Sequence, residues 1–316
     1  MRPGLLSVLL PVHNGMPYLV DAVQSLLRQT FQDFVVLAID NGSSDGTREY
    51  LTGLHNEKIR YVRLEEKSLV KALNTGLDLA ETPLIARMDA DDINHPSRFE
   101  KQVAFLERNR DIGLAGTNGT YIGEAGARHF DWDVPLHHQE IVETMMRRRN
   151  AIAHPTIMFR NEAIKPYRGY DSRYFPCEDY ELFLRIGDKV KLANLPERLY
   201  EWRIREHSVI SDSVKESFKM YHFLAGKYSA IYLKSGGSGG DREMHQAKLW
   251  EKLDIASMII YRKGLGVYLN VNSLAGTFYF LAAAAVNPRR GFHTLKRKAR
   301  ALGRAIFGSE TCRRNQ

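Results

Sequence analysis

The chain has 316 residues, enough for one large α/β domain with an appendage or for two modest domains. Apolar residues make up 44% of it and aromatic residues 10%, which indicates a globular core. Its two cysteines, Cys177 and Cys312, are too few for a disulfide framework and lack the spacing of a zinc site. We therefore expect a reducing, cytoplasmic environment.

The positive charge is concentrated at the C-terminal end. Residues 287–316 contain nine lysines and arginines and one acid, so they carry the whole formal net charge of +8. The rest of the chain is neutral by difference, and the pI of 9.3 therefore describes this tail. Aromatic residues do not interleave with the basic ones, so we expect no nucleic-acid partner.

Apolar runs and helical patterns alternate through the first part of the chain. The run at 5–12 is continuous, as in the central strands of parallel sheets, and no cleavage pattern of a signal peptide follows it. The expected elements are, in order, a strand at 5–12, a helix at 17–29, a strand at 34–40, a helix capped by Ser44 or Asp45, a strand at 59–64, a helix at 68–80, a strand at 84–88 and a helix at 96–108. This alternation predicts an α/β fold with a doubly wound, mostly parallel sheet that binds ligands at the carboxyl ends of its strands.

The second part is less regular, and a run of glycines and serines at 235–240 is its clearest linker. The expected elements are a strand at 112–117, a helix at 141–149, a strand at 156–160, a helix at 179–186, strands at 191–193 and 198–204, and a helix at 209–233. We divide the chain into a first domain at 1–212, a connecting helix at 213–234, a linker at 235–241 and a helical C-terminal extension at 242–316.

Three acids directly follow the expected strand at 84–88: Asp89, Asp91 and Asp92. Side chains alternate along a strand, so Asp89 and Asp91 project from one face if the extended conformation persists that far. Mg²⁺ and Mn²⁺ bind one or two such carboxylates and complete their shell with water and phosphate oxygens. The alternative is a solvated acidic turn that caps the next helix.

Polar side chains also follow the first two expected strands, at His13 and at Asp40 and Asn41. A carboxylate accepts hydrogen bonds from a ring N–H, and an amide both donates and accepts, so either Asp40 or Asn41 suits the edge of a nucleotide base. A turn stabilised by one of these side chains before a helix is the alternative for the second pair. A plain loop is the alternative for His13.

Together these motifs resemble the family 2 glycosyltransferases, which are inverting enzymes with the GT-A fold. The resemblance covers about the first 210 residues, and its segments are VLLPVHN at 8–14, IDNGSSDGT at 39–47, ALNTG at 72–76, MDADD at 88–92 followed by Pro96 and Arg98, HPT at 154–156, and ED at 178–179. Each motif alone is weak, but six in the order and spacing of the family are specific.

The resemblance implies an inverting, metal-dependent glycosyltransferase. Its donor would be a nucleotide sugar, most often UDP-linked, and its acceptor a hydroxyl of a glycan or lipid-linked glycan in surface polysaccharide synthesis. Asp179 would be the general base with Glu178 beside it, and Asp91 and Asp89 would hold Mn²⁺ or Mg²⁺ and the donor ribose. The donor contacts would come from Pro11, His13, Asp40, Asn41, Asn74, Asp89 and Arg203.

Several alternatives stay open. An acidic pair at a helix start also complements the helix dipole, and Arg203 also fits an alternating strand with polar residues facing outward. A catalytically silent nucleotide-binding scaffold is a second function. A sugar nucleotidyltransferase is a third, but it generally needs a glycine-rich basic loop after the first strand, which residues 12–16 do not provide.

The C-terminal extension suggests contact with a membrane or with a second copy of the chain. Residues 267–286 carry no charge, but their polar residues favour a buried helix over a membrane span. Residues 291–307 form an apolar stripe opposite arginines, which is typical of an interfacial helix on an anionic leaflet; a solvated basic tail is the alternative. We expect peripheral contact with the cytoplasmic face of the membrane, or self-association.

Overall fold

The structure, a computed structural model, describes residues 4–205 and helical positions within 220–228 and 281–286. The chain divides into two compact units, and the first contains residues 4–203 with the described positions of 220–228. All elements below belong to this first unit. The predicted linker at 235–241, the basic tail and the domain boundary at 212 lie outside the described residues. No helix in the described part of the chain is long and apolar enough to cross a bilayer.

Nine strands form one sheet in this unit. They are β1 (Leu6–Val12), β2 (Phe34–Asn41), β3 (Ile59–Leu64), β4 (Leu84–Arg87), β5 (Ile93–Asn94), β6 (Ile112–Ile122), β7 (Arg128–Trp132), β8 (Met158–Arg160) and β9 (Lys191–Arg203). The α-helices are α1 (Leu19–Leu27), α2 (Thr47–Gly53), α3 (Leu69–Leu79), α4 (Arg98–Arg108), α5 (His138–Met146), α6 (Asn161–Ile164) and α7 (Glu178–Ile186). The short 3₁₀ helices are η1 (His154–Thr156), η2 (Lys165–Tyr167) and η3 (Ser172–Tyr174).

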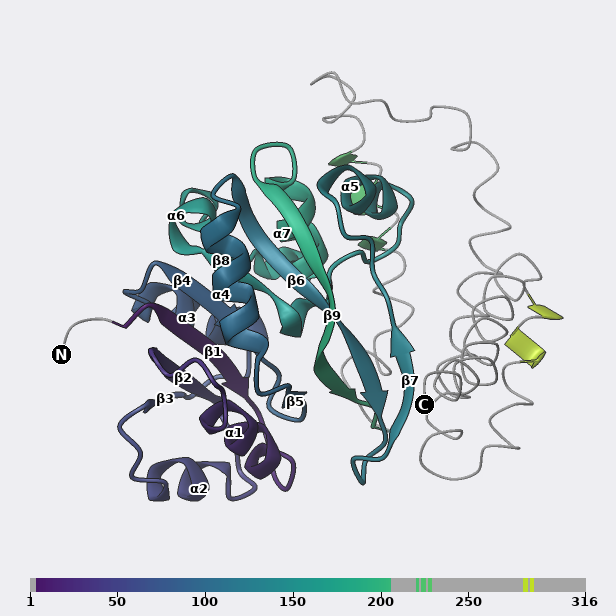
Figure 1. Cartoon of the computed structure of the whole chain (residues 1–316). Helices are drawn as coiled ribbons and strands as arrows, with labels where there is room; N and C mark the ends of the chain where they lie inside the picture. The colour runs from purple at the N-terminus through teal and green to yellow at the C-terminus, as the bar shows by residue number, and fades with distance from the viewer. Residues whose placement is uncertain are drawn as a thin grey trace, which may run out of the picture. The chain divides into compact units, whose positions relative to one another are not determined.

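The strand order is β3-β2-β1-β4-β8-β6-β9-β5, with β7 paired to β6 (Figure 1). The pairs β3–β2, β2–β1 and β1–β4 are parallel, as the alternation of strands and helices predicts. Beyond β4 the sheet is mixed, because β8 runs antiparallel to both β4 and β6, whereas β6 and β9 are parallel. The doubly wound α/β fold is confirmed; the sheet is wholly parallel from β3 to β4 and mixed from β8 to β5.

Helices cover both faces of the sheet (Figure 1). Successive residues of β1 alternate between two hydrophobic clusters: Leu9 packs with α3, α5 and α7, and Val8 and Leu10 pack with α1 and α4. A strand buried on both faces is apolar throughout, which explains the unbroken apolar run at 5–12. The carboxyl ends of β1, β2 and β4 meet at one edge of this two-sided core, and the candidate site lies there.

The structure corrects three local predictions. The expected strands at 191–193 and 198–204 are one strand, β9, whose pairing with β6 shifts register near Thr117 and Asn118. Strand β4 ends at Arg87, so the extended conformation does not reach the acid cluster. Helix α2 begins after Gly46 with no side-chain cap, and Asp45 instead accepts hydrogen bonds from Thr47 N at 3.2 Å and Met16 N at 2.9 Å.

Candidate active site

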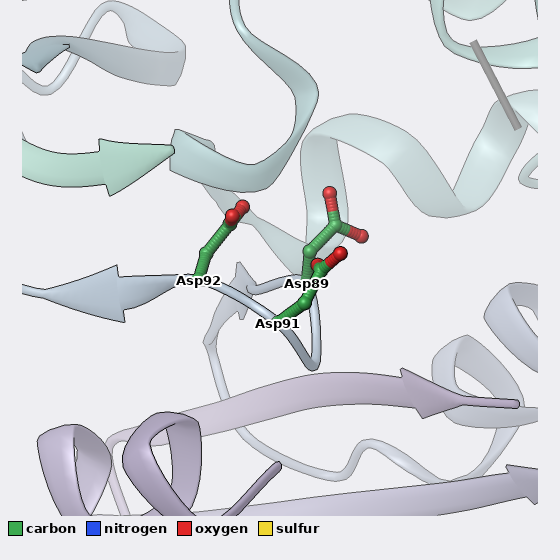
Figure 2. A group of neighbouring side chains, drawn as sticks. All are labelled: Asp89, Asp91 and Asp92. Atoms are coloured by element: carbon green, nitrogen blue, oxygen red, sulfur yellow. The ribbon is translucent and has the colours of Figure 1, made fainter. Parts of the chain in front are cut away.

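Three carboxylates converge in the loop between β4 and β5. Each of Asp89, Asp91 and Asp92 offers an oxygen within 4.8 Å of the others, and Figure 2 shows their side chains extending from the same side of the loop. The tight turn, rather than the alternation of a strand, gathers them. Hard oxygen ligands at this spacing suit Mg²⁺ or Mn²⁺.

Asp92 anchors this loop to β9. Its side chain is fully buried and accepts hydrogen bonds from Tyr200 OH at 2.7 Å and Arg203 N at 2.8 Å. Burial, with the negative charges of Asp91 and Asp89, raises the pKa of Asp92 well above its ordinary value. Asp89 and Asp91 are partly exposed, so they are the members of the cluster that a ligand from solvent reaches first.

Arg203 holds the loop rather than facing solvent. Its guanidinium is buried and donates to Asp91 O at 2.8 Å, Glu124 O at 2.6 Å and Asp21 Oδ2 at 3.2 Å. It also lies over the ring of Tyr18, 4.9 Å from its centroid. These contacts tie Arg203 to the acid loop, and the predicted contact of Arg203 with the donor stays a prediction.

The predicted acidic pair begins helix α7. Asp179 accepts from Tyr180 N at 2.7 Å, and its second oxygen lies 3.4 Å from Asn150 Nδ2. Glu178 is 4% exposed, and its Oε2 is buried without a hydrogen-bond partner. Burial and the charge of Asp179 raise the pKa of Glu178 to about 8. Burial also raises the pKa of Asp179, whereas the hydrogen bond from Tyr180 N–H and the positive charge of Arg87 lower it by less. Both carboxyl groups of the pair are therefore harder to ionise than free ones, because they are buried together.

The raised pKa of Glu178 predicts a pH-dependent stability. The folded protein keeps this proton up to about pH 8, whereas the unfolded chain releases it near pH 4.5, so the contribution to the free energy of unfolding is complete below 4.5 and is lost as pH rises to about 8. Glu178→Gln does not titrate. We expect the stability of the wild type relative to this variant to fall by on the order of 4 kcal/mol over that range, measured by urea unfolding. A constant difference would contradict the assigned proton.

Arg87, which the sequence prediction missed, connects the two acidic groups. Its side chain is 3% exposed, and its Nη2 lies 2.5 Å from Asp89 Oδ1. The positive charge of Arg87 lowers the pKa values of both Glu178 and Asp179, and the negative charge of Asp89 raises that of Glu178. The acid loop and the start of α7 therefore form one electrostatic site. An arginine inside the apolar strand at 84–88 was the signal for it, because a buried charge needs partners.

His154 contributes to the wall of this site as a neutral ring. It is 7% exposed, and its Nε2 lies 2.8 Å from Tyr170 OH. Burial, followed by the charge of Arg87, holds the pKa of His154 well below its ordinary value. A neutral, hydrogen-bonded imidazole agrees with a structural histidine.

The residues predicted to hold the base lie together where β1 and β2 end. Asp40 is fully buried and accepts from Ser43 N at 2.8 Å, Tyr61 OH at 2.8 Å and Arg63 Nη1 at 2.7 Å. Burial opposes ionisation, but these hydrogen bonds and the charge of Arg63 together lower the pKa of Asp40. The hydrogen bond from Ser43 N to the Asp40 side chain forms the side-chain-stabilised turn that was the alternative to base binding. Asp40 is thus an ionised acceptor that is already well partnered.

The neighbours of Asp40 are also engaged. Asn41 Oδ1 accepts from Ser68 N at 2.6 Å, and its carbonyl oxygen accepts from His13 Nδ1 at 2.9 Å. Pro11 pairs in register with Ile39 of β2. A surface depression of about 430 Å³ opens beside the turn, and it is lined by Ser43, Ser44, Gly46, Arg48, Glu49 and Arg63.

Asn74, predicted to contact the donor, binds the backbone of Tyr170. Its amide nitrogen donates to Tyr170 O at 2.8 Å, and its Oδ1 accepts from Tyr170 N at 2.9 Å. Both polar atoms of the side chain therefore bind one backbone segment. These bonds tie Asn74 of α3 to Tyr170, and contact of Asn74 with the donor phosphate or sugar stays a prediction.

Comparison with known proteins decides the family. The model of glycosyl transferase family 2 matches residues 7–168, which include the acid loop and the ends of β1, β2 and β4. The chain belongs to glycosyl transferase family 2.

Two relatives in this family are named for polysaccharide biosynthesis. The O-antigen biosynthesis glycosyltransferase WbnJ of Escherichia coli is 33% identical over 211 residues, which cover 65% of this chain and 81% of WbnJ. The amylovoran biosynthesis glycosyltransferase AmsE of Erwinia amylovora is 33% identical over 207 residues, covering 63% of this chain and 76% of AmsE.

Solved structures of glycosyltransferases share the fold. Residues 1–349 of TarS from S. aureus, in complex with UDP-GlcNAc, give a TM-score of 0.59 at 17% identity over 90% of this chain and 82% of TarS. The mannosyltransferase PcManGT from Pyrobaculum calidifontis, in complex with GDP-Man and Mn²⁺, gives 0.53 at 13% identity over 95% of this chain and 81% of PcManGT. The family 2 chain described here therefore has the GT-A fold that the sequence predicted.

Proposed function

We propose that this family 2 protein is an inverting, metal-dependent hexosyltransferase that moves a sugar from a nucleotide-sugar donor to a hydroxyl of a glycan or lipid-linked glycan. One observation carries the proposal: three carboxylates at the spacing of a cation site and an acidic pair with raised pKa values are linked by Arg87. Nucleotide-sugar transfer needs both, because the diphosphate must be neutralised and the acceptor hydroxyl deprotonated.

Asp91 and Asp89 would hold Mn²⁺ or Mg²⁺. The fit is supported by the three carboxylate oxygens within 4.8 Å and by the partial exposure of both residues. Once bound, such a cation neutralises charge on the departing diphosphate. Asp92 and Arg203 attach the loop to β9 through hydrogen bonds. These bonds hold the proposed metal ligands, Asp89 and Asp91, in position.

Asp179 would act as the general base. It accepts the proton of the acceptor hydroxyl while that oxygen forms a bond to the anomeric carbon of the donor. The bond from this carbon to the diphosphate oxygen breaks on the opposite side, and the nucleoside diphosphate leaves with the electron pair. Attack from the side opposite to the leaving group inverts the configuration. A proton on Glu178 would remove the negative charge next to Asp179 and so would favour the ionised form of Asp179 that a base requires.

The donor is proposed to be UDP-linked, with its base near Asp40, Asn41, His13 and Pro11. Structures of similar fold contain UDP-GlcNAc or GDP-Man, which supports a nucleotide sugar without choosing the base. The names of WbnJ and AmsE support a role in surface polysaccharide synthesis. We place the protein in the cytoplasm, with its basic C-terminal tail at the membrane face where lipid-linked acceptors are found, and a homo-oligomer is compatible with this arrangement.

A thermal-shift and calorimetry screen tests the proposal. UDP, GDP, TDP and CMP are each added with and without Mn²⁺ or Mg²⁺, because a ligand that binds the native state raises its apparent stability. We expect a cation-dependent shift with one diphosphate, and release of that diphosphate from the matching sugar nucleotide when acceptor is supplied. Binding without transfer or hydrolysis across a donor panel would favour the silent scaffold. Pyrophosphate release from a sugar phosphate and a nucleoside triphosphate would favour the nucleotidyltransferase.

A further inference from the structure

Three buried polar atoms at the centre of the site have no hydrogen-bond partner: Nε and Nη1 of Arg87 and Oε2 of Glu178. Both side chains are more than nine-tenths buried. Buried polar groups in proteins are almost always paired, and an unpaired one in a native structure calls for an explanation such as a ligand. These atoms are also complementary, because Arg87 only donates and Glu178 accepts or, when protonated, donates.

We propose that Arg87 and Glu178 bind the hydroxyl groups of the donor hexose and thereby select the sugar. This inference rests on the proposed function and deepens it. A hexose offers neighbouring hydroxyls, each of which accepts a hydrogen bond from an arginine N–H and donates one to a carboxyl oxygen. Sites built to hydrogen-bond a hydroxyl reject analogues that lack it, because the polar groups of the site are then left unpaired.

The fold places these atoms where the donor sugar must lie. Arg87 is the last residue of β4, and the acid loop begins two residues later. Its Nη2 is held by Asp89, while its Nε and Nη1 have no hydrogen-bond partner. Glu178 precedes the proposed base directly. A sugar whose diphosphate lies at Asp89 and Asp91 and whose anomeric carbon is attacked from Asp179 would lie beside Arg87 and Glu178, whose charges interact.

Only the sugar, and not the nucleotide, should depend on these contacts. The test measures calorimetric dissociation constants, in Mn²⁺, for a sugar nucleotide and for its nucleoside diphosphate. The ligands are UDP-glucose, UDP-galactose, UDP-N-acetylglucosamine and GDP-mannose, and the one that the wild type binds most tightly is used. In Arg87→Lys the positive charge remains, but the fixed donors Nε and Nη1 are lost. We expect the sugar nucleotide to weaken by about 10- to 100-fold while the diphosphate changes less than about twofold.

Arg160→Lys is the matched control, because Arg160 of β8 pairs with Leu84 at the opposite end of β4 and donates to Ile112 O at 3.1 Å. If Arg87→Lys does not fold, Glu178→Ala is measured in the same way and should also weaken the sugar nucleotide alone. An unchanged ratio of the two dissociation constants, or an equal loss for both ligands, would overturn the inference. If the wild type binds none of the nucleotides, the proposed function itself is wrong, so the two failures are distinguishable.

Discussion

Asp179→Asn is expected to reduce sugar transfer by about 10²- to 10⁴-fold, the usual contribution of a general base. The amide has the shape of the carboxylate and can still accept from Tyr180 N, which lies 2.7 Å from Oδ1, so α7 should keep its first turn. It cannot take the proton of the acceptor hydroxyl. Donor binding should stay within about twofold of the wild type, because this residue acts on the acceptor.

The measurement pairs the rate of nucleoside diphosphate release in the presence of acceptor with calorimetric binding of the donor. Asp188→Asn provides the matched control, since Asp188 lies two residues beyond the other end of α7 and pairs with Lys189 at 3.5 Å. Equal transfer rates in Asp179→Asn and the wild type would remove Asp179 as the base. A parallel loss of donor affinity and rate would indicate that Asp179 binds the donor instead.

Much of the N-terminal half followed from local pattern. The run at 5–12 is apolar at every position because β1 is buried on both faces, and this signal needs no knowledge of distant residues. The strand at 59–64 and the acid cluster after 84–88 were also predicted from local pattern, because the apolar residues of a strand give way to polar residues where the strand ends. Only the conformation of the acid loop differed, because a turn replaced the extended chain.

The missed features depend on contacts between residues far apart in the sequence. The role of Arg203 follows from its contacts with Asp91 and Asp21, and that of Asn74 from the backbone of Tyr170, 96 positions away. The edge strands β5 and β7 are short or partly polar, and they are strands because β9 and β6 pair with them. Pairing with a distant strand decides whether such segments become strands, and the hydrophobic periodicity of a single sequence carries no information about that pairing.

Asp91→Ala is expected to weaken Mn²⁺-dependent binding of UDP by about 100-fold or more, since a carboxylate ligand and its charge are both removed. Two acids of the same loop distinguish a loss of metal binding from a loss of protein stability. Asp91 is partly exposed, whereas Asp92 is fully buried against Tyr200 and the Arg203 backbone. Asp92→Ala should therefore lower the melting temperature of the protein, by unpairing two buried donors, and Asp91→Ala should leave it nearly unchanged.

The decisive comparison is calorimetry of UDP with and without Mn²⁺ for both loop variants, with Asp78→Ala on the exposed side of α3 as the control. Loss of the cation-dependent part of the affinity in Asp91→Ala, without a change in melting temperature, is the expected result. If Asp91→Ala binds UDP and Mn²⁺ as the wild type does, Asp91 is not the metal ligand. Asp89, the other proposed ligand, would then carry the cation-dependent affinity, and Asp89→Ala rather than Asp91→Ala should remove it. The Asp89 and Asp91 variants together therefore decide which carboxylate of the acid loop holds the cation.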